Sequence, residues 1–138
     1  MLNESFKISI EVECNLETLF LIMTQTEYIS KWSYDDCLFD DYVGGKVELF
    51  SGWVNGKILD YDMNNKVKFS WEPTDWDEDC KSYVIYTFES RGNNLSAIHI
   101  EHFNFPDTSE KENHYDSWYD YVINPAMNFL LEQQQIDY

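Results

Sequence analysis

Two histidines in the C-terminal third of the chain could do acid–base chemistry. His102 lies near the end of an alternating apolar and polar stretch, and His114 lies in the amphipathic segment that follows. An imidazole titrates near neutral pH, so it can act as a general acid or base or hydrogen-bond to a ligand. Alternation places His102 on one face with Ile98 and Ile100, whereas His114 is expected near the surface at a helix start. His102 is therefore the stronger candidate, with a hydrogen-bonded core histidine as the open alternative.

Aromatic residues form a second set of candidates. They make up 17% of the chain, including five Trp and ten Tyr. Such side chains bury much area and carry a polar tip, so they suit either the lining of a cavity or a tightly packed core. If a cavity is present, the residues expected to line it are Trp53, Phe69, Trp71, Val84, Tyr86, Phe88, Ile100, His102, Trp118, Tyr121 and Val122.

Other familiar chemistries are not indicated. His99 alternates away from His102, so the histidines are not expected to converge on a metal. The acidic run at 75–79 lacks the spacing of a calcium loop, and no nucleophile motif or phosphate loop is present. We therefore expect no metal, no cofactor and no catalytic residue. An enzyme would need His102 together with a Tyr or an acidic partner in the same cavity, and Asp60 is a better choice of acidic partner than Glu101.

The composition restricts the partners of this chain. The formal net charge is −17, which repels phosphate backbones and anionic lipids, so we expect neither nucleic acid nor a membrane as a partner. No run approaches the 18 apolar residues of a membrane span, and no signal peptide is recognised. Cys14, Cys37 and Cys80 are odd in number and lack metal-ligand spacing. Reduced thiols in a cytoplasmic protein are the simplest interpretation.

The elements that must position these side chains begin with a strand and two helices. Alternation over Phe6 to Glu13 predicts a strand with one buried face. Asn15 is a good N-cap for a helix whose apolar residues recur between Leu16 and Met23. A second short helix is predicted over Glu27 to Trp32.

A meander of strands follows. Lys46 to Val54 is predicted as a strand that places Trp53 on one face with Val47 and Leu49, and Asn55-Gly56 is predicted as its hairpin turn. The further predicted strands cover 57–63, 66–72, 81–91 and 95–105, with an edge strand near 37–39.

A long helix closes the chain. Ser109 to Glu112 matches a capping box, which predicts a helix start near Ser109. Trp118 and Val122 belong to its apolar stripe. Pro125 lies inside this pattern and should kink the helix, because proline removes a backbone donor.

These elements predict a single domain over residues 1–138 of the α+β class. Its antiparallel sheet has six or seven strands, and its helices are segregated to the two ends of the chain. No internal repeat or linker divides it.

Several short motifs follow one another along the chain: Ile29-Ser30-Lys31-Trp32, Gly44-Gly45-Lys46-Val47, Gly56 to Tyr61, Val67 to Trp71, His102, and His114 with Trp118. Taken in order, they resemble the helix-grip fold of the START/Bet v 1-like (SRPBCC) superfamily. They are most similar to the branch related to the C-terminal domain of the Hsp90 ATPase activator. The resemblance implies a curved sheet wrapped around the C-terminal helix. Ser117 stands where this family often has glycine.

Three functions remain open from the sequence. The first is a module that binds a small lipophilic or aromatic molecule between the sheet and the C-terminal helix. The second, implied by the resemblance, is a protein-interaction domain of the Hsp90-cochaperone type, with a chaperone as partner. The third is a cyclase- or dehydratase-like enzyme. A shared fold does not decide among them.

Overall fold

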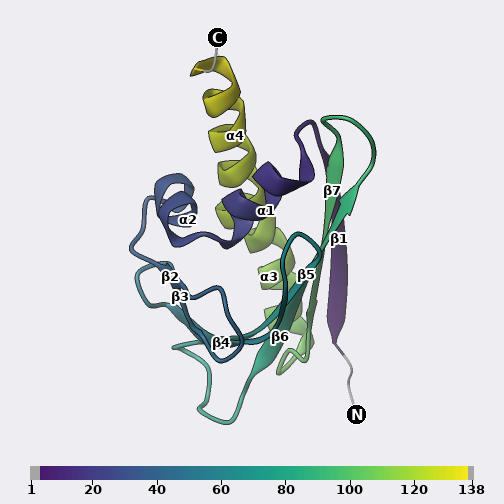
Figure 1. Cartoon of the computed structure of the whole chain (residues 1–138). Coiled ribbons are helices and arrows are strands. Elements are labelled where there is room, and N and C mark those ends of the chain that lie inside the picture. The colour runs from purple at the N-terminus through teal and green to yellow at the C-terminus, as the bar shows by residue number, and fades with distance from the viewer. Residues whose placement is uncertain (1–3, 137–138) are drawn as a thin grey trace.

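The computed structural model describes residues 4–136, which form one seven-stranded antiparallel sheet and a set of helices (Figure 1). The elements are β1 (Ser5–Val12), α1 (Leu16–Thr24), α2 (Thr26–Ser33), β2 (Leu38–Phe39), β3 (Lys46–Leu49), β4 (Val54–Asp62), β5 (Lys66–Pro73), β6 (Ser82–Ser90), β7 (Ser96–Phe103), α3 (Thr108–Trp118), the π-helical turn η1 (Tyr119–Ile123) and α4 (Asn124–Ile136). This confirms the predicted helix-grip α+β fold, with two short helices after the first strand.

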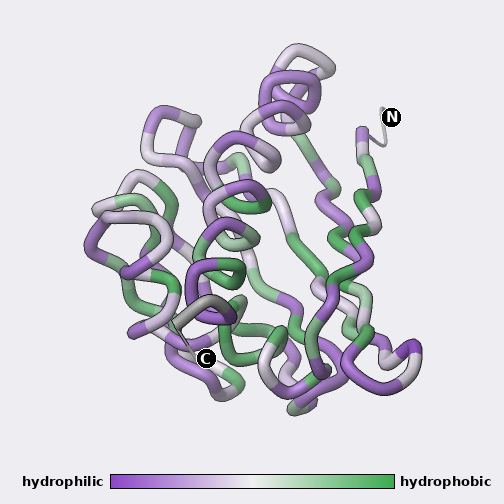
Figure 2. Tube along the Cα trace, turned by 90° about the horizontal axis from the view of Figure 1, so that it is seen from above, coloured by the Kyte–Doolittle hydropathy of each residue, from purple (hydrophilic) through white to green (hydrophobic). Residues whose placement is uncertain are grey.

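The sheet order is β1-β7-β6-β5-β4-β3-β2, so from β2 onward each strand pairs with the next along the chain and β1 closes against β7. The register pairs Ile8 with Ile100 and Val84 with His102. Because side chains alternate across a strand, this register gathers the buried residues of β1, β6 and β7, except Ala97, on one face. Apolar positions recur along the strands, while many of the turns are polar (Figure 2).

The helix α3 and the turn η1 lie over the sheet, and α4 continues from them to pack against α1 and α2 (Figure 1). One apolar stripe along these three segments is buried. The buried residues of this stripe are Trp118, Val122, Ile123, Ala126 and Leu130. Further along, α2 packs against α4, and α1 packs against β6 and β7. The N-cap predicted at Asn15 is present, since its side chain accepts a hydrogen bond from the Thr18 amide at 2.8 Å.

The prediction of a hairpin turn at Asn55-Gly56 is wrong. The chain turns earlier, at Phe50, Ser51 and Gly52, whose φ angles are 55°, 56° and 89°. Gly56 instead lies inside β4, where an added Cβ would overlap the backbone oxygen of Ser70. Glycine is therefore needed there for close approach of two strands and not for a turn.

Placing Trp53 on the face of Val47 and Leu49 is also wrong. The earlier turn ends β3 at Leu49 and leaves Trp53 at the turn with 39% of its surface exposed, while Val47 and Leu49 are buried.

The predicted start of the C-terminal helix also needs correction. Asp107, not Ser109, is the N-cap, and its carboxylate accepts from the Glu110 amide at 2.8 Å. Both positions carry good capping residues, and the helix begins at the earlier one.

The helix irregularity predicted at Pro125 occurs one turn earlier. The Asn124 amide bonds to the Tyr119 carbonyl five residues back, which defines η1. A π-helical turn of this kind accommodates a position where the regular ladder is interrupted.

Candidate functional site

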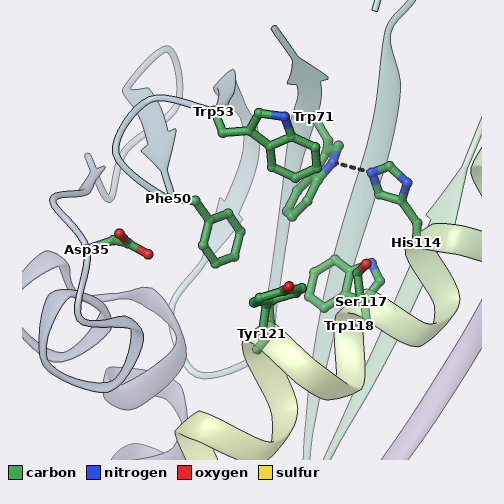
Figure 3. Close-up of a pocket in the computed structure, with 9 residues that line it drawn as sticks. Asp35, Phe50, Trp53, Trp71, His114, Ser117, Trp118 and Tyr121 are labelled. Atoms are coloured by element: carbon green, nitrogen blue, oxygen red, sulfur yellow. Dashed lines mark hydrogen bonds between the residues drawn. The ribbon is translucent and has the colours of Figure 1, made fainter. Parts of the chain in front are cut away.

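A half-open pocket of about 300 Å³ lies where the β3–β4 turn, β5 and the α3–η1 helix meet (Figure 3). Most of its lining is apolar. The lining residues are Asp35, Phe50, Trp53, Trp71, His114, Ser117, Trp118, Tyr121 and Val122.

Aromatic rings set at steep angles form the walls of this pocket. The Phe50 ring lies 6.4 Å from that of Trp53, 6.3 Å from that of Trp71 and 6.4 Å from that of Tyr121, with interplanar angles of 58°, 67° and 70°. Trp71 and Trp118 form the inner wall, with ring centroids 5.2 Å apart. Phe50 thus stands between three other rings, at the side of the pocket nearest the turn.

The left-handed turn after β3 is tied to the loop that follows α2. The Ser51 amide donates to the Asp36 carbonyl at 3.0 Å, and the Ser51 hydroxyl donates to the Asp35 carboxylate at 3.1 Å. These two bonds bring Asp35 to the pocket. Figure 3 shows the Asp35 carboxylate beside the Phe50 ring. The sequence signal for this arrangement is weak, because two non-glycine residues adopt positive φ in the turn.

A chain of hydrogen bonds lies behind the inner wall of the pocket. The Trp118 indole donates to His102 Nδ1 at 3.0 Å, and His102 Nε2 lies 2.8 Å from the Ser82 hydroxyl. Ser82 in turn donates to the Trp71 carbonyl at 2.8 Å. The Trp71 indole donates to His114 Nε2 at 3.2 Å, so both inner-wall tryptophans are held by a histidine.

These contacts determine the tautomer of each ring. An indole N–H can only donate, so His102 Nδ1 and His114 Nε2 must both be unprotonated. The protons therefore lie on His102 Nε2, which faces Ser82, and on His114 Nδ1, which lies 3.0 Å from the Glu110 carbonyl. Both histidines are neutral in this arrangement.

Burial favours the same neutral forms. His102 is 0% exposed and His114 is 4% exposed. Burial, and secondly the nearby His114, holds the pKa of His102 well below its usual value. Burial also lowers the pKa of His114, against the opposing effect of Glu110 and Asp75.

The residues predicted to line a cavity fall into two groups. Trp53, Trp71, Trp118, Tyr121 and Val122 lie on the wall of the pocket. Phe69, Val84, Phe88, Ile100 and His102 are at most 4% exposed and lie in the packed core, as does Tyr86, whose ring contacts those of Phe69 and Trp118. The space between the middle of the sheet and the helix is thus filled by side chains, and the pocket opens at its end.

Four lining residues were not anticipated from the sequence: Asp35, Phe50, His114 and Ser117. The prediction that His114 lies near the surface is wrong. Its ring stacks on that of Trp53 with centroids 6.1 Å apart, and it also contacts the ring of Trp76 at 5.4 Å. His114 lies four residues before Trp118, which puts both side chains on one face of the helix. This spacing could have predicted that His114 is buried.

The acidic partner proposed for His102 is elsewhere. Asp60 is exposed and lies 3.9 Å from the ammonium group of Lys66. Glu101 alternates away from His102, as expected, since His102 is buried and Glu101 is not.

Over residues 4–136, no group of three or more His, Cys, Asp or Glu side chains is placed to hold a metal ion. Within the same residues, no helix is long and apolar enough to span a membrane.

The sheet order, the closing helix and the pocket beside it define a helix-grip domain of the START/Bet v 1-like (SRPBCC) class. Residues 13–124 match the family described as "Activator of Hsp90 ATPase homolog 1-like protein". The chain belongs to this family.

Known proteins of similar sequence and structure agree. The activator of 90 kDa heat shock protein ATPase homolog of Dictyostelium discoideum is 23% identical over 103 residues, which cover 75% of this chain and 27% of that protein. The activator of 90 kDa heat shock protein ATPase homolog 2 of Mus musculus is 27% identical over 76 residues, which cover 55% of this chain and 23% of that protein. This chain therefore matches about a quarter of the length of these curated relatives. The crystal structure of an Hsp90 activator from Plasmodium falciparum is 26% identical with a TM-score of 0.87, over 92% of this chain and 96% of that one.

Proposed function

We propose that this chain binds a small apolar or aromatic molecule in the pocket beside the α3–η1 helix. The observation that carries the proposal is the aromatic wall formed by Phe50, Trp53, Trp71, Trp118 and Tyr121, which is open to solvent on one side. Ligand pockets are typically concave and mostly apolar with a few polar groups, and about 300 Å³ is at the lower end of their usual range. Tyr121 is 62% exposed at the rim, where its ring is accessible to a ligand.

Thermal unfolding in the presence of a panel of small aromatic and lipophilic compounds tests this proposal. A ligand that binds only the folded state, present at 100 times its Kd, should raise the free energy of unfolding by about 2.7 kcal/mol. The same compound should change the tryptophan fluorescence, because three tryptophans line the pocket.

A pair of variants makes the test specific to the pocket. Ser117→Leu places a larger side chain on the wall without removing a hydrogen bond of the two histidines, and it should abolish the shift. Asn113→Leu makes a similar change at an exposed position of α3 and should leave the shift intact. Absence of a shift across the whole panel, or an equal shift in Ser117→Leu, would contradict the proposal.

A second function is favoured by one specific observation. A solved Hsp90 activator matches this chain over nearly its whole length at 26% identity. We therefore also propose that the chain binds the Hsp90 of its own organism and stimulates its ATPase. Because the net charge of this chain is −17, the association we propose uses a positively charged surface of Hsp90.

The expected result is stimulation of ATP hydrolysis by the cognate Hsp90, measured after subtraction of the rate that remains with an Hsp90 inhibitor. The affinity should fall as salt rises from about 50 to about 300 mM, because screening weakens attraction between charged surfaces. A cognate Hsp90 that neither binds the chain nor hydrolyses ATP faster in its presence would exclude this role. It would leave the pocket proposal unaffected.

A further inference from the structure

The polar groups of the pocket favour one kind of ligand over others. All three of its indole N–H groups already donate to acceptors in the protein: Trp53 to Asp75 at 3.1 Å, Trp71 to His114 at 3.2 Å and Trp118 to His102 at 3.0 Å. These N–H groups are therefore not free to bind a ligand, which meets mainly the faces and edges of the rings. An N–H that donates to an acceptor also leaves more electron density on its ring, which makes the ring face more attractive to a positive charge.

The charged groups near the pocket also favour a positively charged ligand. Its nine lining residues include one carboxylate, Asp35, and no Lys or Arg. Asp75 accepts a hydrogen bond from the Trp53 indole at 3.1 Å, and a carboxylate oxygen of Glu110 lies 3.6 Å from His114 Nδ1. The whole chain carries −17, so the long-range field also attracts cations and repels anions.

The Asp35 carboxylate disfavours a neutral ligand. Its side chain is half-buried, and one carboxylate oxygen accepts from Ser51. A neutral molecule that fills the pocket would strip water from this carboxylate without replacing its hydrogen bonds, and burial of an unpaired charge is costly. A cation in the same place would compensate that charge while lying against the rings.

We propose that the ligand of this pocket is a small organic cation, such as an alkyl- or aryl-ammonium compound whose positive group lies between the aromatic rings and Asp35. This inference rests on the proposed ligand-binding function and names its ligand class. The rings of Trp53, Trp71 and Tyr121, each 6.3 to 6.4 Å from that of Phe50, provide more than one face for the cationic group. A quaternary ammonium suits the pocket best, since it is weakly hydrated and needs no hydrogen-bond acceptor.

An isosteric pair of probes tests the charge directly. Choline carries a quaternary nitrogen, and neohexanol carries a quaternary carbon in its place, so the two differ in charge at nearly equal shape. Titration followed by tryptophan fluorescence and by NMR of the indole N–H groups should show choline binding about tenfold more tightly, the size expected of one or two desolvated cation–aromatic contacts. Equal affinity, or preference for neohexanol, would overturn the cation inference while leaving a ligand-binding pocket in place.

A matched pair of variants separates the local carboxylate from the general field. Asp35→Asn and Asp36→Asn each remove one negative charge from adjacent positions, but only Asp35 lines the pocket. Asparagine can still accept from Ser51, so the loop is expected to keep its fold, which the thermal midpoint checks. Asp35→Asn should weaken choline binding about tenfold, whereas Asp36→Asn should change it less than about twofold.

Equal losses in the two variants would assign the preference to the overall charge and overturn the role of Asp35. If neither probe binds to the wild-type protein, the cation inference fails. The panel of aromatic and lipophilic compounds then decides separately whether the pocket binds a neutral molecule.

Discussion

Gly56→Ala is expected to destabilise the protein by about 3 kcal/mol or more, among the largest losses from adding a single methyl group. The added Cβ would overlap the carbonyl oxygen of Ser70 and lie 2.8 Å from its carbonyl carbon. Both atoms are backbone, so no side-chain rotation relieves the clash, and β4 and β5 would have to separate. The Lys57 amide, which donates to the Ser70 hydroxyl at 2.9 Å, would lose its partner as well.

Gly52→Ala provides the matched control for this prediction. Gly52 has a φ of 89°, but nothing lies within 4 Å of the position that its methyl group would take. The cost is therefore only the conformational strain of about 1 kcal/mol. Urea unfolding followed by circular dichroism measures both variants. A Gly56→Ala protein as stable as Gly52→Ala would show that β4 and β5 do not approach so closely, whereas an unfolded Gly56→Ala beside a folded Gly52→Ala would support the close approach.

The contrast between these glycines explains which parts of the fold were accessible to sequence reasoning. Alternation over a strand depends only on which side chains are buried, so the meander and its register of apolar faces could be predicted. Asn55-Gly56 satisfies the local chemistry of a hairpin turn, but its glycine is required by a strand that is a neighbour only in space. In the observed turn, Phe50 and Ser51 have positive φ angles, which their residue types do not predict.

Only part of the candidate site could be predicted from the sequence, for the same reason. Trp71 and Trp118 could be placed on facing surfaces by their periodicity, and they do form the inner wall. Asp35 and Phe50 come from a loop and a turn whose approach depends on the two hydrogen bonds of Ser51, which no periodic pattern encodes. His114 was predicted to lie near the surface because a histidine near a helix start is usually solvated. In the structure it accepts a hydrogen bond from the Trp71 indole.

Acidification below pH 6.5 is expected to reduce the free energy of unfolding through His102. Burial holds the pKa of its imidazole well below the ordinary 6.5, so the folded protein keeps this ring neutral while the unfolded chain takes up a proton. The stabilisation from the neutral ring is therefore complete above about pH 6.5. As the pH falls further it is lost at about 1.4 kcal/mol per pH unit, down to the lowered pKa of the folded state.

Urea unfolding of the wild type and of His102→Gln between about pH 7.5 and 5 measures this loss. Glutamine does not titrate, so the difference between the two slopes isolates the histidine from the 26 acidic residues, whose protonation affects both proteins. The wild-type curve should fall more steeply on the acid side of the ordinary histidine pKa, and parallel curves would contradict the prediction.

If His102→Gln does not fold, ¹⁵N NMR of the wild-type imidazoles provides the second measurement. In the folded protein His102 should keep the Nε2-protonated neutral form well below pH 6.5, because burial lowers its pKa and its Nδ1 accepts from Trp118. A protonated His102 could not accept that hydrogen bond and would leave the buried Trp118 indole without a partner. Since Trp118 is part of the inner wall, the pocket and the stability of the core should be lost together on acidification. A His102 imidazole that is charged in the folded protein near pH 6 would refute this coupling.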